Sequence, residues 1–108
     1  MSTEQTTQIS VELVVVGASW CDPCKKVKAE LPALLEGLVG ELLVKHLDVD
    51  EDEEECDEIN VTKIPTLVFR YGGKERERHV GGDSVLLGKF ISKCKVHLSL
   101  GGAFGDSI

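Results

Sequence analysis

The sequence predicts an α/β domain with a mixed four-stranded sheet, and two observations lead to this prediction. Segments of strand and helix character alternate along the chain in the order β-α-β-α-β-β-α. A helical segment joins the first two strands, which makes them parallel, whereas Gly72-Gly73 joins the last two as a tight hairpin, which makes them antiparallel. The 108 residues suffice for one domain with its own core. We expect its three helices to cover both faces of the sheet.

Each element is predicted from its own pattern. Strands, marked by β-branched or apolar runs with turn residues at their ends, are expected at residues 11–16, 42–49, 66–71 and 74–80. Helices, marked by apolar residues on one helical face, are expected at residues 25–39, 50–60 and 84–98. Within the first helix, Pro32 should introduce a kink, and Gly40 should end it.

The composition of three strands predicts their places in the sheet. Residues 11–16 are apolar almost without a break, as in a central strand that is covered on both faces. Residues 42–49 are apolar enough to predict a second internal strand. Residues 74–80 alternate basic and acidic side chains, which indicates an edge strand protected from mispairing.

The two ends of the chain differ from the segment between them. Residues 1–10 are polar, and we expect a mobile tail there, followed by the domain at residues 11–99. We expect a flexible tail at residues 100–108, although Phe104 and Ile108 leave open a short docking signal.

Charge and hydropathy exclude several classes of function. The net charge is −7, and residues 48–58 alone hold nine acids and no base, which argues against nucleic acid or an anionic membrane as partner. This acidic patch is either a solvated helix face or a docking site for a basic partner. No apolar run approaches the roughly 20 residues of a membrane span. The polar start lacks the features of a secretory signal, so we expect a cytoplasmic protein.

The sequence Trp-Cys-Asp-Pro-Cys at residues 20–24 carries the clearest chemical signal. Two cysteines two residues apart, between a strand and a helix of a βαβ unit, indicate a thiol–disulfide redox site. Cys21 falls at the helix N-terminus, where free N–H groups and the helix dipole should lower its pKa. Its thiolate would attack a disulfide, and Cys24, one turn later, would resolve the mixed disulfide. Pro23 would stiffen the turn between them.

In this context the chain resembles the thioredoxin family, over roughly residues 11–98. The resemblance rests on the element order and on three motifs, which are Trp-Cys-Asp-Pro-Cys at 20–24, Ile-Pro-Thr at 64–66 and Val-Gly at 80–81. It implies a thioredoxin-like fold and the reduction of protein disulfides. It also implies that no cofactor is bound and that the Cys21–Cys24 disulfide is itself the redox centre.

The resemblance also implies a substrate-binding surface. Pro65 matches the family's cis proline, and the backbone of Ile64 would pair with the substrate chain as an added strand. Gly81 and Gly82 would flatten the neighbouring wall. Trp20 would offer a flat apolar surface beside the nucleophile.

Three features depart from the family pattern. A buried acid is usual where this chain has Val15, and a nearby lysine is usual where it has His46. His46 is therefore either a substitute base or an ordinary strand residue. Asp22 stands where glycine is usual between the cysteines, and its charge should modulate the redox pair. Finally, too few residues precede the first strand for the family's leading strand and helix.

Three functions remain open at this point. The first is a monomeric protein-disulfide reductase that is served by a thioredoxin reductase-type electron donor. The second is a glutaredoxin-like protein that is reduced by glutathione. The sequence of residues 20–24 argues against this second function. The third is a binding or scaffold module that uses the groove and the acidic patch. A metal site is not predicted, because Cys21 and Cys24 lack a second ligand pair of suitable spacing. Cys56 and Cys94 are expected to be packed thiols.

The charge of Asp22 leads to a first testable prediction. Replacing Asp22 by Gly removes a negative charge beside the Cys21 thiolate, so the pKa of Cys21 falls and the reduction potential rises. Each tenfold change in the redox equilibrium corresponds to about 30 mV, which a glutathione redox titration resolves. Glu36→Gln, a similar loss of charge farther along the chain, is the control. A potential that stays unchanged or falls in Asp22→Gly contradicts the prediction.

Overall fold

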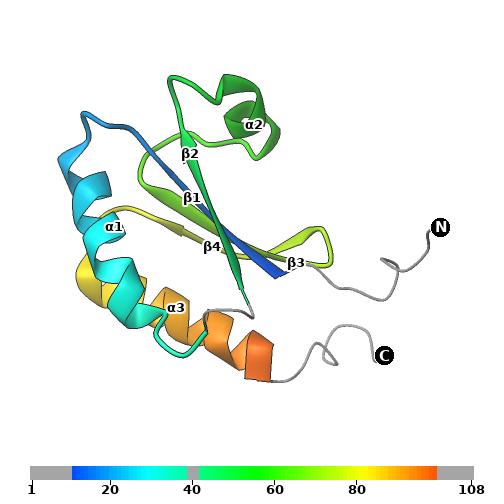
Figure 1. Ribbon diagram of the computed structural model, residues 1–108. Helices are drawn as coiled ribbons and strands as arrows, with labels where there is room; N and C mark the ends of the chain where they lie inside the picture. Colours follow the sequence, from blue (N-terminus) through cyan, green and yellow to red (C-terminus); the bar gives the residue numbers. More distant parts are fainter. Residues whose placement is uncertain (1–10, 39–41, 100–108) are drawn as a thin grey trace.

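The computed structural model describes residues 11–38 and 42–99 (Figure 1). Its strands are β1 (Val11–Gly17), β2 (Leu43–Asp48), β3 (Thr66–Tyr71) and β4 (Lys74–Val80). Its helices are α1 (Asp22–Leu34), α2 (Glu53–Glu58) and α3 (Ser84–Ser99). The predicted order of elements and the mixed four-stranded α/β sheet are confirmed. Residues 1–10 and 100–108, predicted to be tails, lie outside the described residues, so those predictions and the predicted lack of a leading strand and helix remain predictions.

The sheet has the strand order β2-β1-β3-β4. β1 pairs with β2 in parallel and with β3 antiparallel, and β3 pairs antiparallel with β4. β1 is central, as predicted, and its residues Leu13 to Val16 are all buried. β4 is an edge strand, which is also as predicted.

The prediction that β2 is an internal strand is wrong. Among the described residues β2 pairs only with β1, so it forms the other edge of the sheet. Its apolar character arises because helices cover its two faces: Val44 packs on one side and Leu47 on the other. Leu43 nevertheless remains 59% exposed. Apolar composition reports whether the faces of a strand are covered, not whether both of its edges are paired.

The helices lie on both faces of the sheet (Figure 1). α1 and α3 share one face, where Val27 and Leu31 of α1 join Leu87 and Ile91 of α3 in one buried cluster with Phe69. α2 lies on the opposite face, where Cys56 packs with alternate residues of β1 and β3. Because the side chains of a strand alternate between faces, β1 contributes to both clusters.

Two helices are shorter at their C-terminal ends than predicted. α1 ends at Leu34 rather than at Val39, and Gly37, three residues farther on, has a φ of +91° that is incompatible with a continued right-handed helix. Pro32 lies inside α1, as predicted. Gly40, expected to end this helix, lies outside the described residues. α2 ends at Glu58, and Asn60 adopts a φ of 55°, a left-handed conformation that often follows a helix end.

None of the helices in residues 11–38 and 42–99 is both long enough and apolar enough to cross a membrane.

Candidate redox site

The two motif cysteines lie at the start of α1 and are joined by a disulfide, with 5.2 Å between their Cα atoms. Cys21 is the N-cap residue of the helix, and the main-chain N–H of Cys24 donates to its Sγ at 3.2 Å. Pro23 occupies the first turn, where a missing N–H removes no helical hydrogen bond. After reduction, this N–H and the helix dipole would stabilise a thiolate on Cys21.

Because Gly17 has no side chain, the disulfide can lie close to the end of β1. A Cβ atom at Gly17 would lie 3.0 Å from Cys24 Cβ and 3.1 Å from its Sγ, which is too close for an unstrained contact. The turn that follows is closed by the N–H of Cys21, which donates to the carbonyl of Ala18 at 3.2 Å. Gly17 was not identified as a site residue from the sequence. A glycine at a strand end just before a Cys-x-x-Cys motif was the available signal.

The pairing of the strands brings the three motifs together. Thr66 lies opposite Val16 in the β1–β3 pair and opposite Val80 in the β3–β4 pair. The residues just outside these positions therefore meet at one end of the sheet, beside the disulfide. Their proximity follows from strand register, which a sequence read without a known fold does not give.

The predicted substrate-binding residues form a wall beside the disulfide. The Ile64–Pro65 peptide bond is cis, and Ile64 packs against the cluster that contains both cysteines. The N–H of Gly81 donates to the carbonyl of Pro65 at 2.9 Å. Gly82 lies so close to Pro23 that an added Cβ would be 3.0 Å from Pro23 Cβ. The structure thus brings Ile64, Pro65, Gly81 and Gly82 to the motif.

Trp20 borders the same surface and is 63% exposed. Its indole Nε1 donates a 2.8 Å hydrogen bond to Asp50 Oδ2, within the acidic stretch. This bond orients the indole while leaving most of its apolar area open to a partner. Asp50 was not identified as a site residue from the sequence, because its contact with Trp20 spans 30 positions along the chain.

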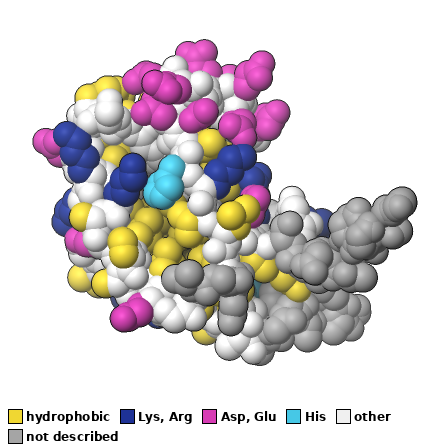
Figure 2. All heavy atoms as spheres, viewed as in Figure 1, with side chains coloured by type: hydrophobic (Ala, Val, Ile, Leu, Met, Phe, Trp, Pro, Cys, Tyr) yellow, Lys and Arg dark blue, Asp and Glu magenta, His cyan; other side chains and the backbone are white. Residues whose placement is uncertain are grey.

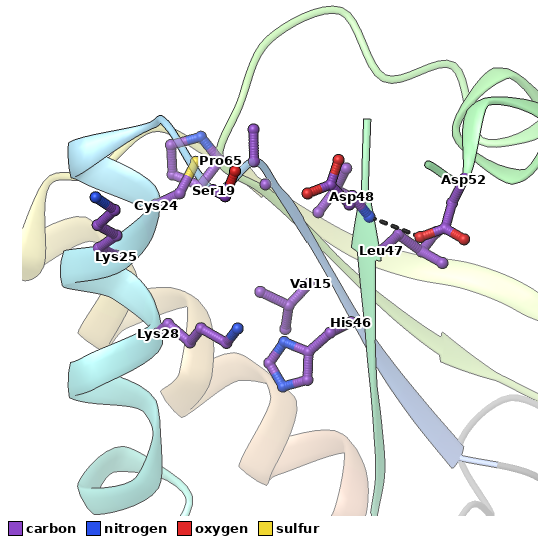
Figure 3. Close-up of a pocket in the computed structure, with 13 residues that line it drawn as sticks. Val15, Ser19, Cys24, Lys25, Lys28, His46, Leu47, Asp48, Asp52 and Pro65 are labelled. Carbon is purple, nitrogen blue, oxygen red and sulfur yellow. Dashed lines mark hydrogen bonds between the residues drawn. The ribbon is translucent and has the colours of Figure 1, made fainter. Parts of the chain in front are cut away.

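A cavity of about 400 Å³ lies behind Cys24 (Figure 3). Val15 and His46 line it, and Lys28 of α1 extends its amine toward the His46 ring. Partial burial of the imidazole, together with the charge of Lys28, lowers the pKa of His46. A pKa below the ordinary value favours the neutral form of the imidazole. Lys28 was not identified as a site residue from the sequence.

Two carboxylates also line this cavity, but main-chain donors engage them. Asp48 Oδ1 accepts from the N–H of Asp50 at 2.7 Å, and Asp52 Oδ2 accepts from the N–H of Asp48 at 2.8 Å. One oxygen of each carboxylate is therefore already bonded to the main chain. By contrast, Asp22 lies on the surface, where Lys25 Nζ is 3.8 Å from its Oδ1.

Cys56 and Cys94 are buried thiols on opposite faces of the sheet. Burial, followed by the nearby Asp52 and Asp57, raises the pKa of Cys56. Burial raises the pKa of Cys94 to about 12. Both thiols are thus poor nucleophiles, and the sheet separates them. Among the residues that the structure describes, no group of three or more His, Cys, Asp or Glu side chains is arranged to hold a metal ion.

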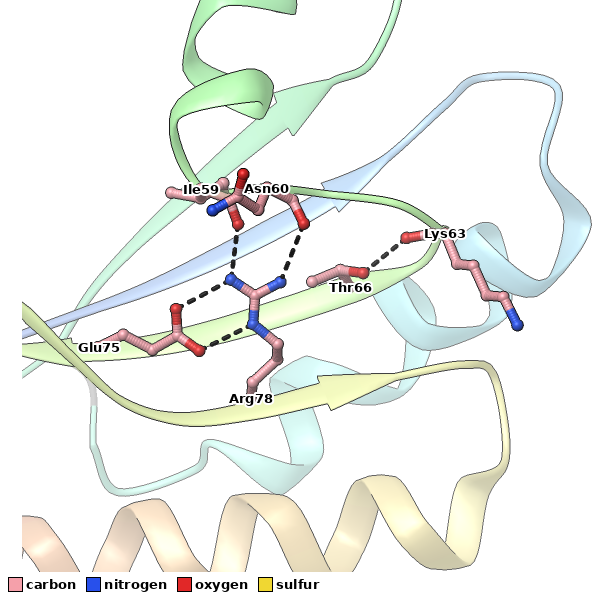
Figure 4. A network of polar contacts seen from close by, with 6 residues as sticks. All are labelled: Ile59, Asn60, Lys63, Thr66, Glu75 and Arg78. Atoms are coloured by element: carbon pink, nitrogen blue, oxygen red, sulfur yellow. Dashed lines mark hydrogen bonds and ion pairs between the residues drawn. The ribbon is translucent and has the colours of Figure 1, made fainter.

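Arg78 anchors the loop that leads to Ile64 and Pro65 (Figure 4). Its Nη2 donates to the carbonyl of Ile59 at 2.6 Å, and its Nη1 donates to that of Asn60 at 3.4 Å. Glu75 accepts two further hydrogen bonds from the same guanidinium, at 2.8 and 2.9 Å, and these are the main cause of the lowered pKa of Glu75. The far end of the loop is closed by Thr66 Oγ1, which donates to the carbonyl of Lys63 at 2.6 Å.

Comparison with known proteins agrees with this geometry. The family model described as Thioredoxin matches residues 3–93. The chain belongs to the thioredoxin family. Members of this family are thiol–disulfide oxidoreductases, and in this chain the Cys21–Cys24 disulfide lies at the N-terminus of α1.

Individual relatives show how far the similarity extends. Thioredoxin H2 of Arabidopsis thaliana is 40% identical over 88 residues, which are 80% of this chain and 65% of that protein. The Bifunctional thioredoxin reductase/thioredoxin of Mycobacterium leprae (strain TN) is 39% identical over 77 residues, 69% of this chain but only 17% of that protein. The X-ray structure of Fasciola hepatica thioredoxin superposes with a TM-score of 0.69 at 32% identity, covering 78% of this chain and 80% of that one. The chain thus spans under two thirds of the two relatives compared by sequence.

From its contacts we predict that Arg78 positions the wall beside the disulfide at Ile64 and Pro65. Arg78→Ala frees the loop before Ile64, so KM for a disulfide-containing protein rises several-fold while kcat changes little. The free energy of unfolding falls by about 1–2 kcal/mol, since hydrogen bonds to a charged group are lost. Steady-state kinetics and urea denaturation measure both effects. Arg76→Ala is the matched control, because Arg76 contacts Tyr71 on the same hairpin instead of the loop. Equal KM values in the two variants would contradict this role.

Proposed function

We propose that this protein reduces disulfide bonds in other proteins in the cytoplasm and is re-reduced by a thioredoxin reductase-type partner. The observation that carries the proposal is the position of Cys21 as N-cap of α1, bonded by the N–H of Cys24 and adjoining the wall formed at Ile64 and Pro65.

The reaction proceeds in two exchanges. The Cys21 thiolate attacks one sulfur of the substrate disulfide, forms a mixed disulfide and releases the other substrate sulfur as a thiolate. The Cys24 thiolate then attacks Cys21 Sγ, which releases the second substrate thiolate and forms the Cys21–Cys24 disulfide. Two electrons pass from the dithiol to the substrate, and the reductase restores them.

The shape of the site supports a protein substrate. Trp20 is largely exposed beside the disulfide, and Ile64 is half-buried against it. An extended peptide laid along Ile64 would pair with its main chain while its apolar side chains contact Trp20. The acidic patch around the site would favour substrates with basic residues near their disulfides.

The reductase partner is supported by a relative. The Mycobacterium leprae protein is, by its name, a thioredoxin reductase and a thioredoxin in one chain, and this chain matches 17% of its length. Glutathione is the alternative donor. We expect the domain to act as a monomer.

An insulin-reduction assay tests the proposal. With dithiothreitol as electron source, the wild type should precipitate insulin quickly, whereas Cys21→Ser should be inactive, because the attacking thiolate is lost. Cys24→Ser should instead trap the mixed disulfide, which mass spectrometry detects. Replacing dithiothreitol by NADPH and a thioredoxin reductase, or by glutathione, identifies the donor. Equal rates for Cys21→Ser and the wild type would contradict enzymatic function and favour a binding module.

We further propose that His46 receives the proton of Cys24 through water in the cavity behind it. His46 and Cys24 line the same cavity, Val15 offers no acid there, and main-chain donors engage the carboxylates of Asp48 and Asp52. A neutral imidazole can accept a proton, and the lowered pKa of His46 keeps it neutral near pH 7.

This role predicts a change in the pH profile of the resolving step. In the wild type, resolution should slow as the pH falls through the lowered pKa of His46, because the imidazole becomes protonated and can no longer accept. His46→Asn should lose this inflection and resolve the mixed disulfide about tenfold or more slowly at pH 7. Stopped-flow release of substrate measures the step. His79→Asn, a change at a histidine outside the cavity, is the control. An unchanged profile in His46→Asn would exclude the role.

A further inference from the structure

His79 is a buried histidine close to the wall beside the disulfide. It is the last residue but one of β4, and only 7% of it is exposed. Its partner in the β3–β4 pair is Leu67, which belongs to the core under α1 and α3. The ring of Phe90, from α3, lies with its centroid 5.6 Å from that of the imidazole. The imidazole is thus enclosed between the sheet and α3.

The imidazole bonds to a residue of the wall. Its Nε2 lies 2.9 Å from the carbonyl oxygen of Gly81. A carbonyl oxygen only accepts hydrogen bonds, so Nε2 carries the hydrogen and donates it. Burying an imidazole among apolar side chains is unfavourable unless such a bond is made. A leucine would pack at this position without that requirement, so what the histidine adds to the packing is this bond.

Gly81 is held by hydrogen bonds at both of its main-chain groups. Its N–H donates to the carbonyl of Pro65 at 2.9 Å, and its carbonyl accepts from His79. Its φ of +109° is open to glycine, but glycine also has more freedom to leave such a conformation than other residues have. Gly82, which lies against Pro23, adds a second glycine to the segment. The two hydrogen bonds therefore restrict a segment whose sequence would otherwise leave it flexible.

We propose that His79 is a positioning residue that orders the Gly81–Gly82 part of the wall for a protein substrate. This inference rests on the function proposed above. A wall that is ordered before binding loses little conformational freedom when the substrate arrives, so the hydrogen bond from His79 strengthens substrate binding. His79 acts through Gly81 and does not line the cavity behind Cys24, so the exchange of sulfur atoms is left unchanged.

The same bonds define what Gly81 offers to a substrate. Its N–H is already bonded to Pro65, so this N–H is not free to pair with an added strand. Gly81 and Gly82 instead present main chain without side chains, which lets a substrate strand that pairs with Ile64 pass close to them. Such a close approach requires that the two glycines stay in one position.

The acidic patch contributes to recognition in a different way. Its side chains gather over α2 in Figure 2, whereas His79 lies on the opposite face of the sheet, with α3. Charge attracts a basic substrate from a distance, but the position of the wall matters only on contact. A change at His79 should therefore leave the salt dependence of the reaction as it is in the wild type.

Kinetics with a protein disulfide and a small disulfide test this proposal. In His79→Leu, KM for insulin should rise about two- to tenfold, as expected for the loss of one hydrogen bond, while kcat changes little. His79→Gln should restore KM, because the glutamine amide places an N–H near the position of Nε2. Phe90→Leu, which alters the packing around the ring but keeps the bond, is the matched control. Hydroxyethyl disulfide, which is too small to extend along the wall, should be reduced at the wild-type rate by every variant.

Amide hydrogen exchange tests the same role without turnover. The Gly81 amide should exchange about tenfold faster in His79→Leu than in the wild type, because one of the two bonds that hold Gly81 is lost. A wild type that fails to reduce insulin would contradict the proposed function, whereas this exchange rate would still decide whether His79 fixes Gly81. The resolving step takes place within one covalent complex, so its pH profile should be that of the wild type in the His79 variants.

Three results would overturn the proposal. The first is a wild-type KM and a wild-type Gly81 exchange rate in His79→Leu, which would show that the bond does not order the wall. The second is an equal rise of KM in Phe90→Leu, which would assign the effect to packing around the ring. The third is a KM in His79→Gln as high as in His79→Leu, which would mean that a donor at Nε2 is not what the wall requires.

Discussion

The burial of β1 on both faces is the constraint on which the rest of the structure depends. Leu13 and Val15 pack under α1 and α3, while Val14 and Val16 pack under α2. β3 is likewise paired on both sides and contributes to both clusters, so β1 and β3 together form the centre of the sheet. The end of β1 is therefore fixed in position, and the N–H of Val49 adds a 3.0 Å hydrogen bond to the carbonyl of Gly17. The disulfide turn begins one residue later.

The chemistry of the site follows from where the strands end. β3 begins and β4 ends at the same end of the sheet at which β1 ends, so the segments around Pro65 and Gly81 converge on the start of α1. The parallel strand β2 also ends there, and Asp48 lies opposite Gly17. This brings the acidic stretch to the site and gives Trp20 its partner. Cys21 thus lies at a helix N-terminus, beside the segments around Pro65 and Gly81 and beside a negatively charged border.

The two remaining cysteines lie on opposite faces of the sheet, in different surroundings. Cys94 lies among apolar side chains under α3, and Cys56 lies on the other side beneath acidic α2. Each environment opposes a thiolate, which leaves Cys21 and Cys24 as the pair suited to exchange. The sheet edges differ as well: β4 is protected by charged side chains, whereas β2 borders an apolar groove.

Local patterns in the sequence were sufficient for much of the fold and for the chemistry of the disulfide. The limits of β3 and β4, the buried face of α3 and the redox role of the Cys-x-x-Cys motif all depend on residues close together in the chain. The resemblance to a known family added the wall at Ile64, Pro65 and Gly81. The early end of α1 was not predicted. The edge position of β2 was not predicted either, because composition does not report which strand edges are paired.

What the sequence by itself determined was therefore the order of the elements and the position of the cysteine pair at the start of a helix, since periodicity, capping and cysteine spacing act over a few residues. Three contacts were decided only by the tertiary structure. Gly17 lies against Cys24, Asp50 accepts a hydrogen bond from Trp20, and Arg78 donates hydrogen bonds to the loop before Ile64. These contacts join residues 7 to 30 positions apart in the chain. They depend on strand register and helix packing, which form only when the whole core assembles.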